Sequence, residues 1–237
     1  SWPRFPLPGR SGRARPSLVA AAGILIALSI TASGCGDGGA EAAGDLSKET
    51  VAGDSISVGL GSSLRGAVAP TVTVKVIGQG GTGLARPDRF DWPARLEELA
   101  RDFPPDVLVF SVGSNDTQDL RSADGAVVAT MAEGWEDEYT SRLAAAFDAF
   151  EESDTRVVWV GHVRTEDPAV GQTNRDVHAI AAELAAERDW VEVQDLAELT
   201  GSGDDEVSEC LISDGLHLSL ECYDEAATAL ADRLGVS

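Results

Sequence analysis

Five short runs of apolar and β-branched residues alternate with segments of helical spacing, and this alternation limits the possible folds of the chain more than any other feature. Parallel strands need long crossover connections, which helices usually supply, so the alternation predicts a parallel sheet covered on both faces. We therefore expect an α/β protein, a three-layer α/β/α sandwich. The expected strands are 50–52, 71–77, 107–112, 156–161 and 190–193, and the expected helices are 57–65, 92–102, 133–150, 173–187 and 219–234.

In an open parallel sheet, ligands bind in the crevice outside the carboxyl ends of the strands. Functional side chains are therefore expected in the loops that follow the strands, or in the loop before the last helix. These loops are 53–57, 78–83, 113–116, 161–167 and 213–217.

The first of these loops contains Gly53-Asp54-Ser55, between a short apolar strand and a segment that can begin a helix. A serine on such a tight turn is held at the edge of the sheet, with its hydroxyl exposed beside the free amides of a helix. An acyl-transfer nucleophile would occupy this position. Gly-Asp-Ser is also common in ordinary turns, so the motif alone leaves both interpretations open.

Two further loops carry polar residues suited to the same chemistry. Asn115 follows the third strand, where a side-chain amide can donate a hydrogen bond to a developing oxyanion; the alternative is that Asn115 only shapes the turn. Asp214 lies three residues before His217, ahead of the last helix. An aspartate at this spacing can hold one imidazole nitrogen while the other faces a nucleophile as a general base. By itself, His217 could equally be an ordinary surface residue.

Taken together, four blocks resemble the SGNH hydrolases, the GDSL-like esterases. They are Gly-Asp-Ser after the first strand, glycines after the second, Gly-Ser-Asn-Asp after the third and Asp-Gly-Leu-His before the last helix. The segment 82–93 looks like an exported bacterial subgroup of that family. The resemblance covers roughly 50–234 and implies a flavodoxin-like fold with a five-stranded parallel sheet. The sequence departs from the family name at Ile56, where leucine is usual.

The roles implied by this resemblance follow the matching positions. Ser55 would be the nucleophile, His217 its general base and Asp214 the acid that orients His217. The oxyanion would be held by the Ser55 amide, by the Asn115 side chain and by a glycine amide of the second block. That glycine is either Gly83, which fits the Thr-Gly-Leu sequence, or Gly81, which fits the spacing nearly as well. Such a mechanism requires no cofactor, and no Cys/His cluster has the spacing of a zinc site.

The N-terminal residues predict export. Residues 1–17 contain arginine and proline but no acid, and an apolar run over 18–30 is followed by small residues and Cys35. This pattern is typical of a signal peptide, and the small residues before the cysteine resemble a bacterial lipoprotein box. Cys35 would then be the lipidated first residue and a membrane anchor; the alternatives are cleavage with release and an uncleaved anchor. Residues 36–49 read as a flexible tether, and 50–237 as the hydrolase-like domain.

The two remaining cysteines indicate a disulfide, and the net charge bears on which partners the protein can bind. Cys210 and Cys222 bracket the segment that carries Asp214 and His217, and in an exported protein they can form a disulfide; the alternative is two free, partly buried thiols. The chain contains 18 Lys and Arg against 40 Asp and Glu, a net charge of -22. A surface this acidic argues against nucleic acid as a partner.

Three functions fit the sequence. The first is an extracytoplasmic serine esterase that acts on a small-molecule or glycan acyl ester, for example an acetyl ester of a cell-wall or extracellular glycan. The second uses the same triad to transfer the acyl group to a sugar hydroxyl. The third is a catalytically silent binding lipoprotein with the same fold, which the presence of Ser55, Asn115, Asp214 and His217 disfavours.

Overall fold

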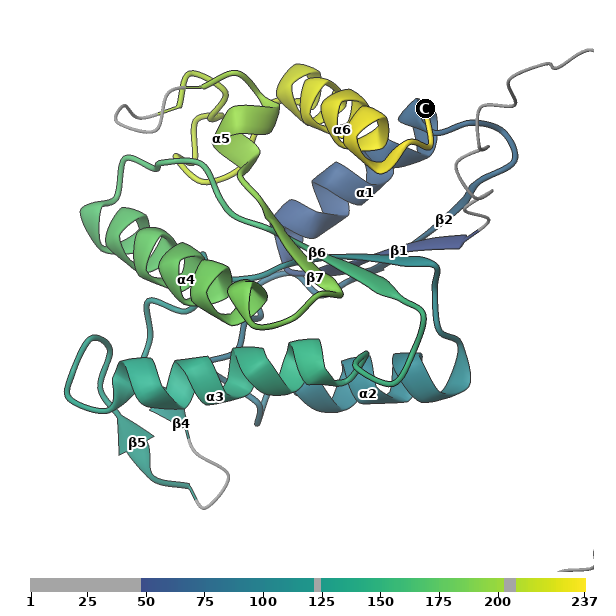
Figure 1. Ribbon diagram of the computed structural model, residues 1–237. Coiled ribbons are helices and arrows are strands. Elements are labelled where there is room, and N and C mark those ends of the chain that lie inside the picture. Colours follow the sequence, from purple (N-terminus) through teal and green to yellow (C-terminus); the bar gives the residue numbers. More distant parts are fainter. Residues whose placement is uncertain (1–47, 122–124, 203–207) are drawn as a thin grey trace, which may run out of the picture. The chain divides into compact units, whose positions relative to one another are not determined.

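The computed structural model describes residues 48–121, 125–202 and 208–237 (Figure 1). The chain divides into two units, Ser1–Glu41 and Ala42–Ser237, and all the described residues belong to the second. The expected signal peptide, Cys35 and the tether up to residue 47 lie outside the described residues. Within the described part of the chain, no helix is both long and apolar enough to cross a membrane.

The core of the domain is a five-stranded parallel sheet in the order β2-β1-β3-β6-β7. This confirms the expected α/β class and the flavodoxin-like strand order. The strands are β1 (Lys48–Gly53), β2 (Thr73–Gly78), β3 (Val107–Ser111), β6 (Arg156–Val160) and β7 (Val191–Gln194). The order reverses between β1 and β3, so the carboxyl ends of these two strands are where such a fold is expected to bind a ligand.

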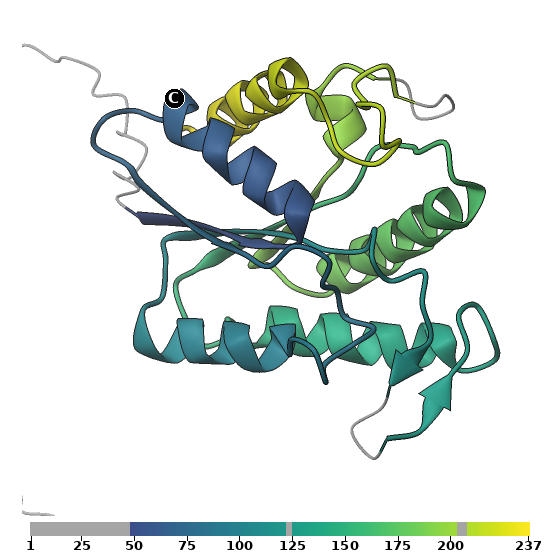
Figure 2. The same cartoon turned by 180° about the vertical axis from the view of Figure 1, so that it is seen from behind.

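Successive side chains of a strand point to opposite faces of the sheet, and each face has its own layer of helices. In β3, Val107 and Val109 join one apolar cluster, whereas Leu108 and Phe110 join the other. The first cluster lies under α1 (Ser55–Ala67), α5 (Leu196–Leu199) and α6 (Leu220–Leu234). The second lies under α2 (Trp92–Asp102), α3 (Trp135–Asp148) and α4 (Pro168–Ala186). Figures 1 and 2 show α1 and α6 side by side in both views.

Several bounds differ from the expected ones. The first strand begins at Lys48 rather than at residue 50, because Lys48 pairs in register with Thr73 of β2. Helix α4 begins at Pro168, five positions before the expected start, and Asp167 caps it through the amides of Ala169 and Val170. An additional hairpin, β4 (Leu120–Arg121) and β5 (Val127–Val128), was not expected from the sequence.

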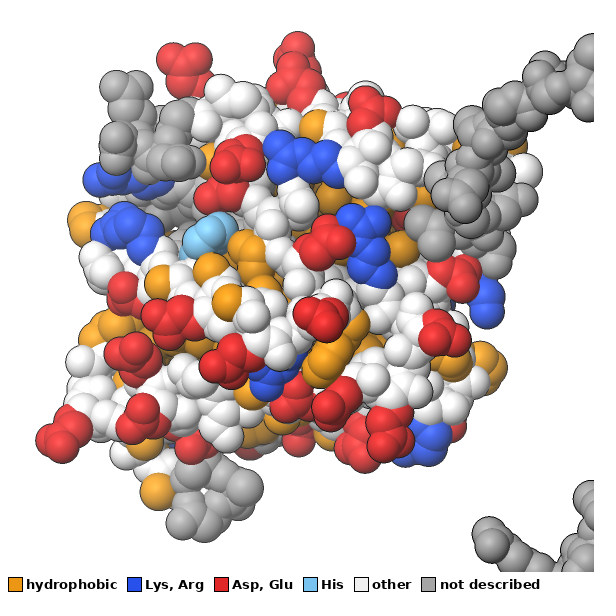
Figure 3. All heavy atoms as spheres, viewed as in Figure 1, with side chains coloured by type: hydrophobic (Ala, Val, Ile, Leu, Met, Phe, Trp, Pro, Cys, Tyr) orange, Lys and Arg blue, Asp and Glu red, His pale blue; other side chains and the backbone are white. Residues whose placement is uncertain are grey.

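The face of the domain seen in Figure 3 carries many acidic side chains and few basic ones. This agrees with the net charge of -22. Acidic side chains occur over helices on both sides of the sheet, including Glu183 on α4 and Asp224 on α6.

Candidate active site

The turn that carries Ser55 is fixed by a close approach of two strands. Gly53 has a φ of +136°, and a Cβ at this position would lie 1.9 Å from the backbone oxygen of Ser111 on β3. The next amide, that of Asp54, donates to the same oxygen at 3.1 Å. Only glycine allows this backbone conformation together with this contact. The turn therefore places Ser55 at the first position of α1, at the carboxyl ends of β1 and β3.

Ser55, His217 and Asp214, which the sequence singled out, form one hydrogen-bonded chain. His217 Nε2 lies 2.7 Å from Ser55 Oγ, and His217 Nδ1 lies 2.8 Å from Asp214 Oδ2. An ionised Asp214 accepts the Nδ1–H, so Nε2 is left to accept the Ser55 hydroxyl proton. This geometry is the one required for a serine nucleophile, its general base and an orienting acid.

Asp214 is held in its ionised form by its own turn. Its Oδ1 accepts from the amides of His217 at 2.9 Å and Leu216 at 3.0 Å. These backbone hydrogen bonds, that of His217 first, lower the pKa of Asp214 to about 2, and the hydrogen bond to the His217 side chain adds to the effect. The carboxylate is therefore charged throughout the neutral range and keeps the imidazole in the required tautomer.

A disulfide joins Cys210 to Cys222 across the segment that carries Asp214 and His217. The sequence had left free thiols as the alternative, and the structure has the disulfide instead. Next to it, the Ser219 amide donates to the Cys210 backbone oxygen at 2.8 Å, and the Ile212 amide donates to the His217 backbone oxygen at 2.9 Å. The loop is thus closed both covalently and by backbone hydrogen bonds.

Asn115 follows β3 at the carboxyl end of the sheet, and its side-chain amide is engaged. Nδ2 donates to Asp54 Oδ2 at 3.2 Å and to the Thr82 backbone oxygen at 3.0 Å. An amide nitrogen carries two hydrogens, so these bonds occupy both. Asn115 would have to release one of the two acceptors in order to donate to an oxyanion formed at Ser55.

Asp54 is fully buried beside the proposed nucleophile. Burial raises the pKa of Asp54 to about 7, although hydrogen bonds from the Ile56 amide, the Ser57 amide and Asn115 act in the opposite direction. The carboxyl group caps α1 by accepting the Ile56 amide at 2.9 Å. Asp54 therefore connects the start of α1 to the Asn115 side chain.

Asp116, the last residue of Gly-Ser-Asn-Asp, has a structural role that the sequence did not reveal. Its buried carboxyl accepts from the amides of Leu84 and Ala85, at 3.0 and 2.8 Å, and from the Tyr139 hydroxyl at 2.8 Å. Burial raises the pKa of Asp116 to about 6. Through these bonds, Asp116 ties the turn that carries Asn115 to the loop after β2.

The glycines after β2 differ in what surrounds them. A Cβ at Gly83 would lie 2.2 Å from Asp116 Oδ1, so Gly83 is packed against Asp116. A Cβ at Gly81, whose φ is +72°, would meet nothing within 4 Å. A Cβ at Gly80 would lie 3.8 Å from Ser55 Cβ. Gly83, one of the two glycines that the sequence favours as the oxyanion donor, is thus packed against the turn that carries Asn115, and Gly80 lies near Ser55.

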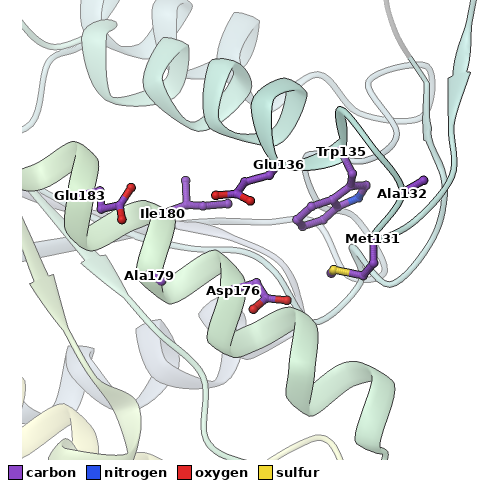
Figure 4. A pocket seen from close by; sticks show the side chains of 8 residues that line it. All are labelled: Met131, Ala132, Trp135, Glu136, Asp176, Ala179, Ile180 and Glu183. Carbon is purple, nitrogen blue, oxygen red and sulfur yellow. The ribbon is translucent and has the colours of Figure 1, made fainter.

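A cavity lies between α3 and α4, away from Ser55 and His217 in the sequence and in its lining residues (Figure 4). None of the residues expected from the sequence to do chemistry lines it. The residues that line this cavity are Met131, Ala132, Trp135, Glu136, Asp176, Ala179, Ile180 and Glu183.

In the described ranges, no group of three or more His, Cys, Asp or Glu side chains is arranged to hold a metal ion.

Residues 49–229 match the model of a protein family described as "Protein of unknown function (DUF459)". The chain belongs to this family. No curated protein matches the chain significantly.

Solved structures show which fold this family member has. An aryl esterase from M. smegmatis has a TM-score of 0.59 at 15% identity, over 81% of this chain and 100% of that one. A catalytic mutant of an acetylxylan esterase from Geobacillus stearothermophilus has a TM-score of 0.56 at 19% identity, over 81% and 95%. A protein from Slackia heliotrinireducens assigned to the SGNH hydrolases has a TM-score of 0.53 at 20% identity, over 78% and 97%. The chain has the fold of the SGNH hydrolases.

Proposed function

We propose that the protein is a serine esterase that hydrolyses short acyl esters through Ser55, His217 and Asp214. The observation that carries the proposal is the unbroken chain of hydrogen bonds from Ser55 Oγ through the His217 imidazole to Asp214, at 2.7 and 2.8 Å. A serine hydroxyl is a weak nucleophile until a neighbouring base takes its proton. The fold that the chain shares with an aryl esterase and an acetylxylan esterase supports the same chemistry.

In the reaction, Ser55 Oγ attacks the ester carbonyl while His217 Nε2 takes the hydroxyl proton. The oxyanion of the tetrahedral intermediate would accept hydrogen bonds from the Ser55 amide and from the Asn115 side chain. A third donor would be a glycine amide of the loop after β2, for which the sequence favours Gly83 or Gly81. His217 then gives its proton to the leaving alcohol, and an acyl-enzyme remains. Water activated by His217 releases the acid and restores Ser55.

We further propose that the substrate is an acetyl ester of a glycan outside the cytoplasm, and that the enzyme is held at the membrane by lipid on Cys35. Support for the location comes from the sequence of residues 1–35 alone. A Cys35→Ser variant expressed in a bacterium should move from the membrane fraction to the soluble fraction. Retention of that variant in the membrane would contradict a lipid anchor at this residue.

The function is tested by measuring hydrolysis of p-nitrophenyl acetate, butyrate and octanoate, together with acetate release from acetylated xylooligosaccharides. Wild-type protein should hydrolyse the acetyl esters, and Ser55→Ala should not. Ser62→Ala is a matched control, because Ser62 lies on the exposed face of the same helix and donates to the Val58 backbone oxygen. Equal activity of wild type and Ser55→Ala would contradict the proposal. Acetyl transfer to an added sugar without acetate release would favour the acyltransferase.

A further inference from the structure

The chain has three histidines, and one of them, His162, has a defined structural setting without a role in the proposed chemistry. It follows β6, on the opposite side of β3 from β1. Both of its ring nitrogens contact serine hydroxyls. Nε2 lies 2.9 Å from Ser111 Oγ, and Nδ1 lies 2.6 Å from Ser114 Oγ. Ser114 is the residue directly before Asn115.

The direction of these hydrogen bonds follows from the partner of Ser111. The Ser111 hydroxyl donates to the backbone oxygen of Val160 at 2.9 Å, so it has no hydrogen left for His162. Ser111 Oγ therefore accepts from His162 Nε2–H. In the neutral imidazole the other nitrogen, Nδ1, is an acceptor, and it receives the Ser114 hydroxyl proton. These hydrogen bonds form one chain, called the relay here, that runs from the Ser114 hydroxyl through His162 and Ser111 to the backbone of β6.

The relay fixes the turn that carries Asn115 on one side. The turn is closed by the Asp116 amide, which donates to the Gly113 backbone oxygen at 2.8 Å. The His162 ring also packs against the turn, since a Cβ at Gly113 would lie 3.8 Å from its Cε1. Asp116 holds the other side of the turn to the loop after β2. Without His162, Ser114 would keep only a long 3.5 Å contact with Asn174 Oδ1.

We propose that neutral His162 is a positioning residue, which holds the Ser114 side of the turn so that the Asn115 side-chain amide stays beside Asp54, the residue before Ser55. The effect on the reaction rate rests on the proposed esterase function, whereas the placement of Asn115 does not. Only the neutral imidazole can accept from Ser114 while it donates to Ser111. Burial lowers the pKa of His162 to about 4, so the neutral form predominates near neutral pH.

The test compares His162→Phe, which removes both hydrogen bonds, with His162→Gln. A glutamine side chain can donate to Ser111 through its amide nitrogen and accept from Ser114 through its oxygen. We expect His162→Phe to lower kcat by up to about 10²-fold with little change in KM, the size of effect that follows a small misplacement of a catalytic group. His162→Gln should retain most of kcat. His178→Phe is the control, because it also replaces a histidine that packs against Trp159 of β6, and in the described residues no hydrogen bond joins His178 to Ser111 or Ser114.

A double-mutant cycle separates positioning from general support of the fold. If His162 acts through Asn115, then His162→Phe should change kcat by less than about 2-fold in an Asn115→Ala background, because the group that it positions is already absent. Additive losses would overturn the proposal. If His162→Phe does not fold, Ser114→Ala takes its place in the cycle, since it removes the donor at the other end of the same bond and the same non-additivity is expected.

A measurement that needs no activity distinguishes failure of this proposal from failure of the esterase assignment. In ¹⁵N NMR spectra, His162 should show a protonated Nε2 and an unprotonated Nδ1 at neutral pH. The Asn115 side-chain NH₂ resonances should shift in His162→Phe and remain near the wild-type position in His162→Gln. Unchanged Asn115 resonances in His162→Phe, or the opposite tautomer in wild type, would overturn the proposal even in an active enzyme.

Discussion

His217 Nε2 lies 2.7 Å from Ser55 Oγ, although 162 positions separate the two residues in the chain. The contact follows from the packing of α1 against α6, the two helices that begin next to these residues. Gly59 allows the helices to approach, because a Cβ at this position would lie 2.3 Å from the ring of Tyr223. Ser55 and His217 are thus positioned by the same pair of helices that covers one face of the sheet.

The turn before Ser55 should not tolerate a side chain at Gly53. In Gly53→Ala, the new methyl group would overlap the Ser111 backbone oxygen, and the φ of +136° would be strained. We expect a loss of several kcal/mol in the free energy of unfolding, as is usual for overpacking combined with backbone strain. Urea unfolding measures this change.

The control for Gly53→Ala is Gly66→Ala near the end of α1, where a Cβ meets nothing within 4 Å. Alanine is favoured over glycine in a helix by roughly 0.5–1 kcal/mol, so this variant should be as stable as wild type or more so. Equal stability of the two variants would show that the approach of Gly53 to Ser111 does not constrain the turn.

Asn115→Ala should reduce kcat by about 10²–10³-fold, the usual cost of one oxyanion donor. KM should change little, because the lost hydrogen bond forms in the transition state and not with the bound ester. Steady-state kinetics with p-nitrophenyl acetate provide the measurement. An unchanged kcat would mean that Asn115 keeps its bonds to Asp54 and Thr82 throughout the reaction and takes no part in it.

The strands and the turns that carry Ser55 and Asp214 were predictable because their signals are local. Buried strands such as β3 are continuous apolar runs, and Ser55 and Asp214 belong to short motifs whose turn geometry follows from a few adjacent residues. The hairpin of β4 and β5 was missed because each strand has only two residues. The early start of α4 was missed because apolar spacing outweighed the Asp167-Pro168 start signal.

The contacts that the sequence did not reveal are long-range. Three glycines lie within 80–83, and the sequence does not reveal that Gly83 packs against Asp116 while Gly80 lies near Ser55. His162 lies 48 positions from Ser114, so no local pattern connects them. Likewise, the hydrogen bonds from the Leu84 and Ala85 amides to the buried Asp116 carboxyl join residues about 30 positions apart, and no sequence motif indicates them.

Loss of the disulfide should loosen the segment that carries His217. In the double variant Cys210→Ser, Cys222→Ser, we expect stability to fall by roughly 3 kcal/mol, the loop-entropy value for a ring of this size. Esterase activity should fall as well, because Asp214 and His217 lie within the closed loop. Thermal unfolding and kcat, each with and without dithiothreitol, measure both effects. Reductant should change wild type and leave the double variant unaffected; a wild type insensitive to complete reduction would contradict this role.

The buried carboxyl group of Glu49 should make the free energy of unfolding decrease as the pH rises. It is 1% exposed in β1, neither carboxyl oxygen has a hydrogen-bond partner, and burial raises its pKa from 4.5 to about 7. The folded state therefore binds this proton more tightly than the unfolded state, and the contribution of Glu49 to stability declines as pH rises from about 4.5 to about 7. The decline is on the order of 3 kcal/mol at most.

Glu49→Gln removes this titration. Urea unfolding at pH 5 and pH 8 should show the variant gaining stability relative to wild type at the higher pH. The comparison between the two proteins cancels the contributions of the other buried carboxyls, Asp54 and Asp116, whose raised pKa values act in the same direction. A difference in stability between the two proteins that does not change with pH would contradict the raised pKa of Glu49.

In the proposed mechanism His217 activates Ser55 as a nucleophile, and covalent labelling with a fluorophosphonate probe followed by peptide mass spectrometry tests this most directly. We expect one adduct per chain, located on Ser55, absent in Ser55→Ala and formed at least about 10³-fold more slowly in His217→Ala. The control His178→Ala should label at the wild-type rate. A folded wild-type protein that remains unlabelled, or that carries the adduct on another residue, would contradict the claim.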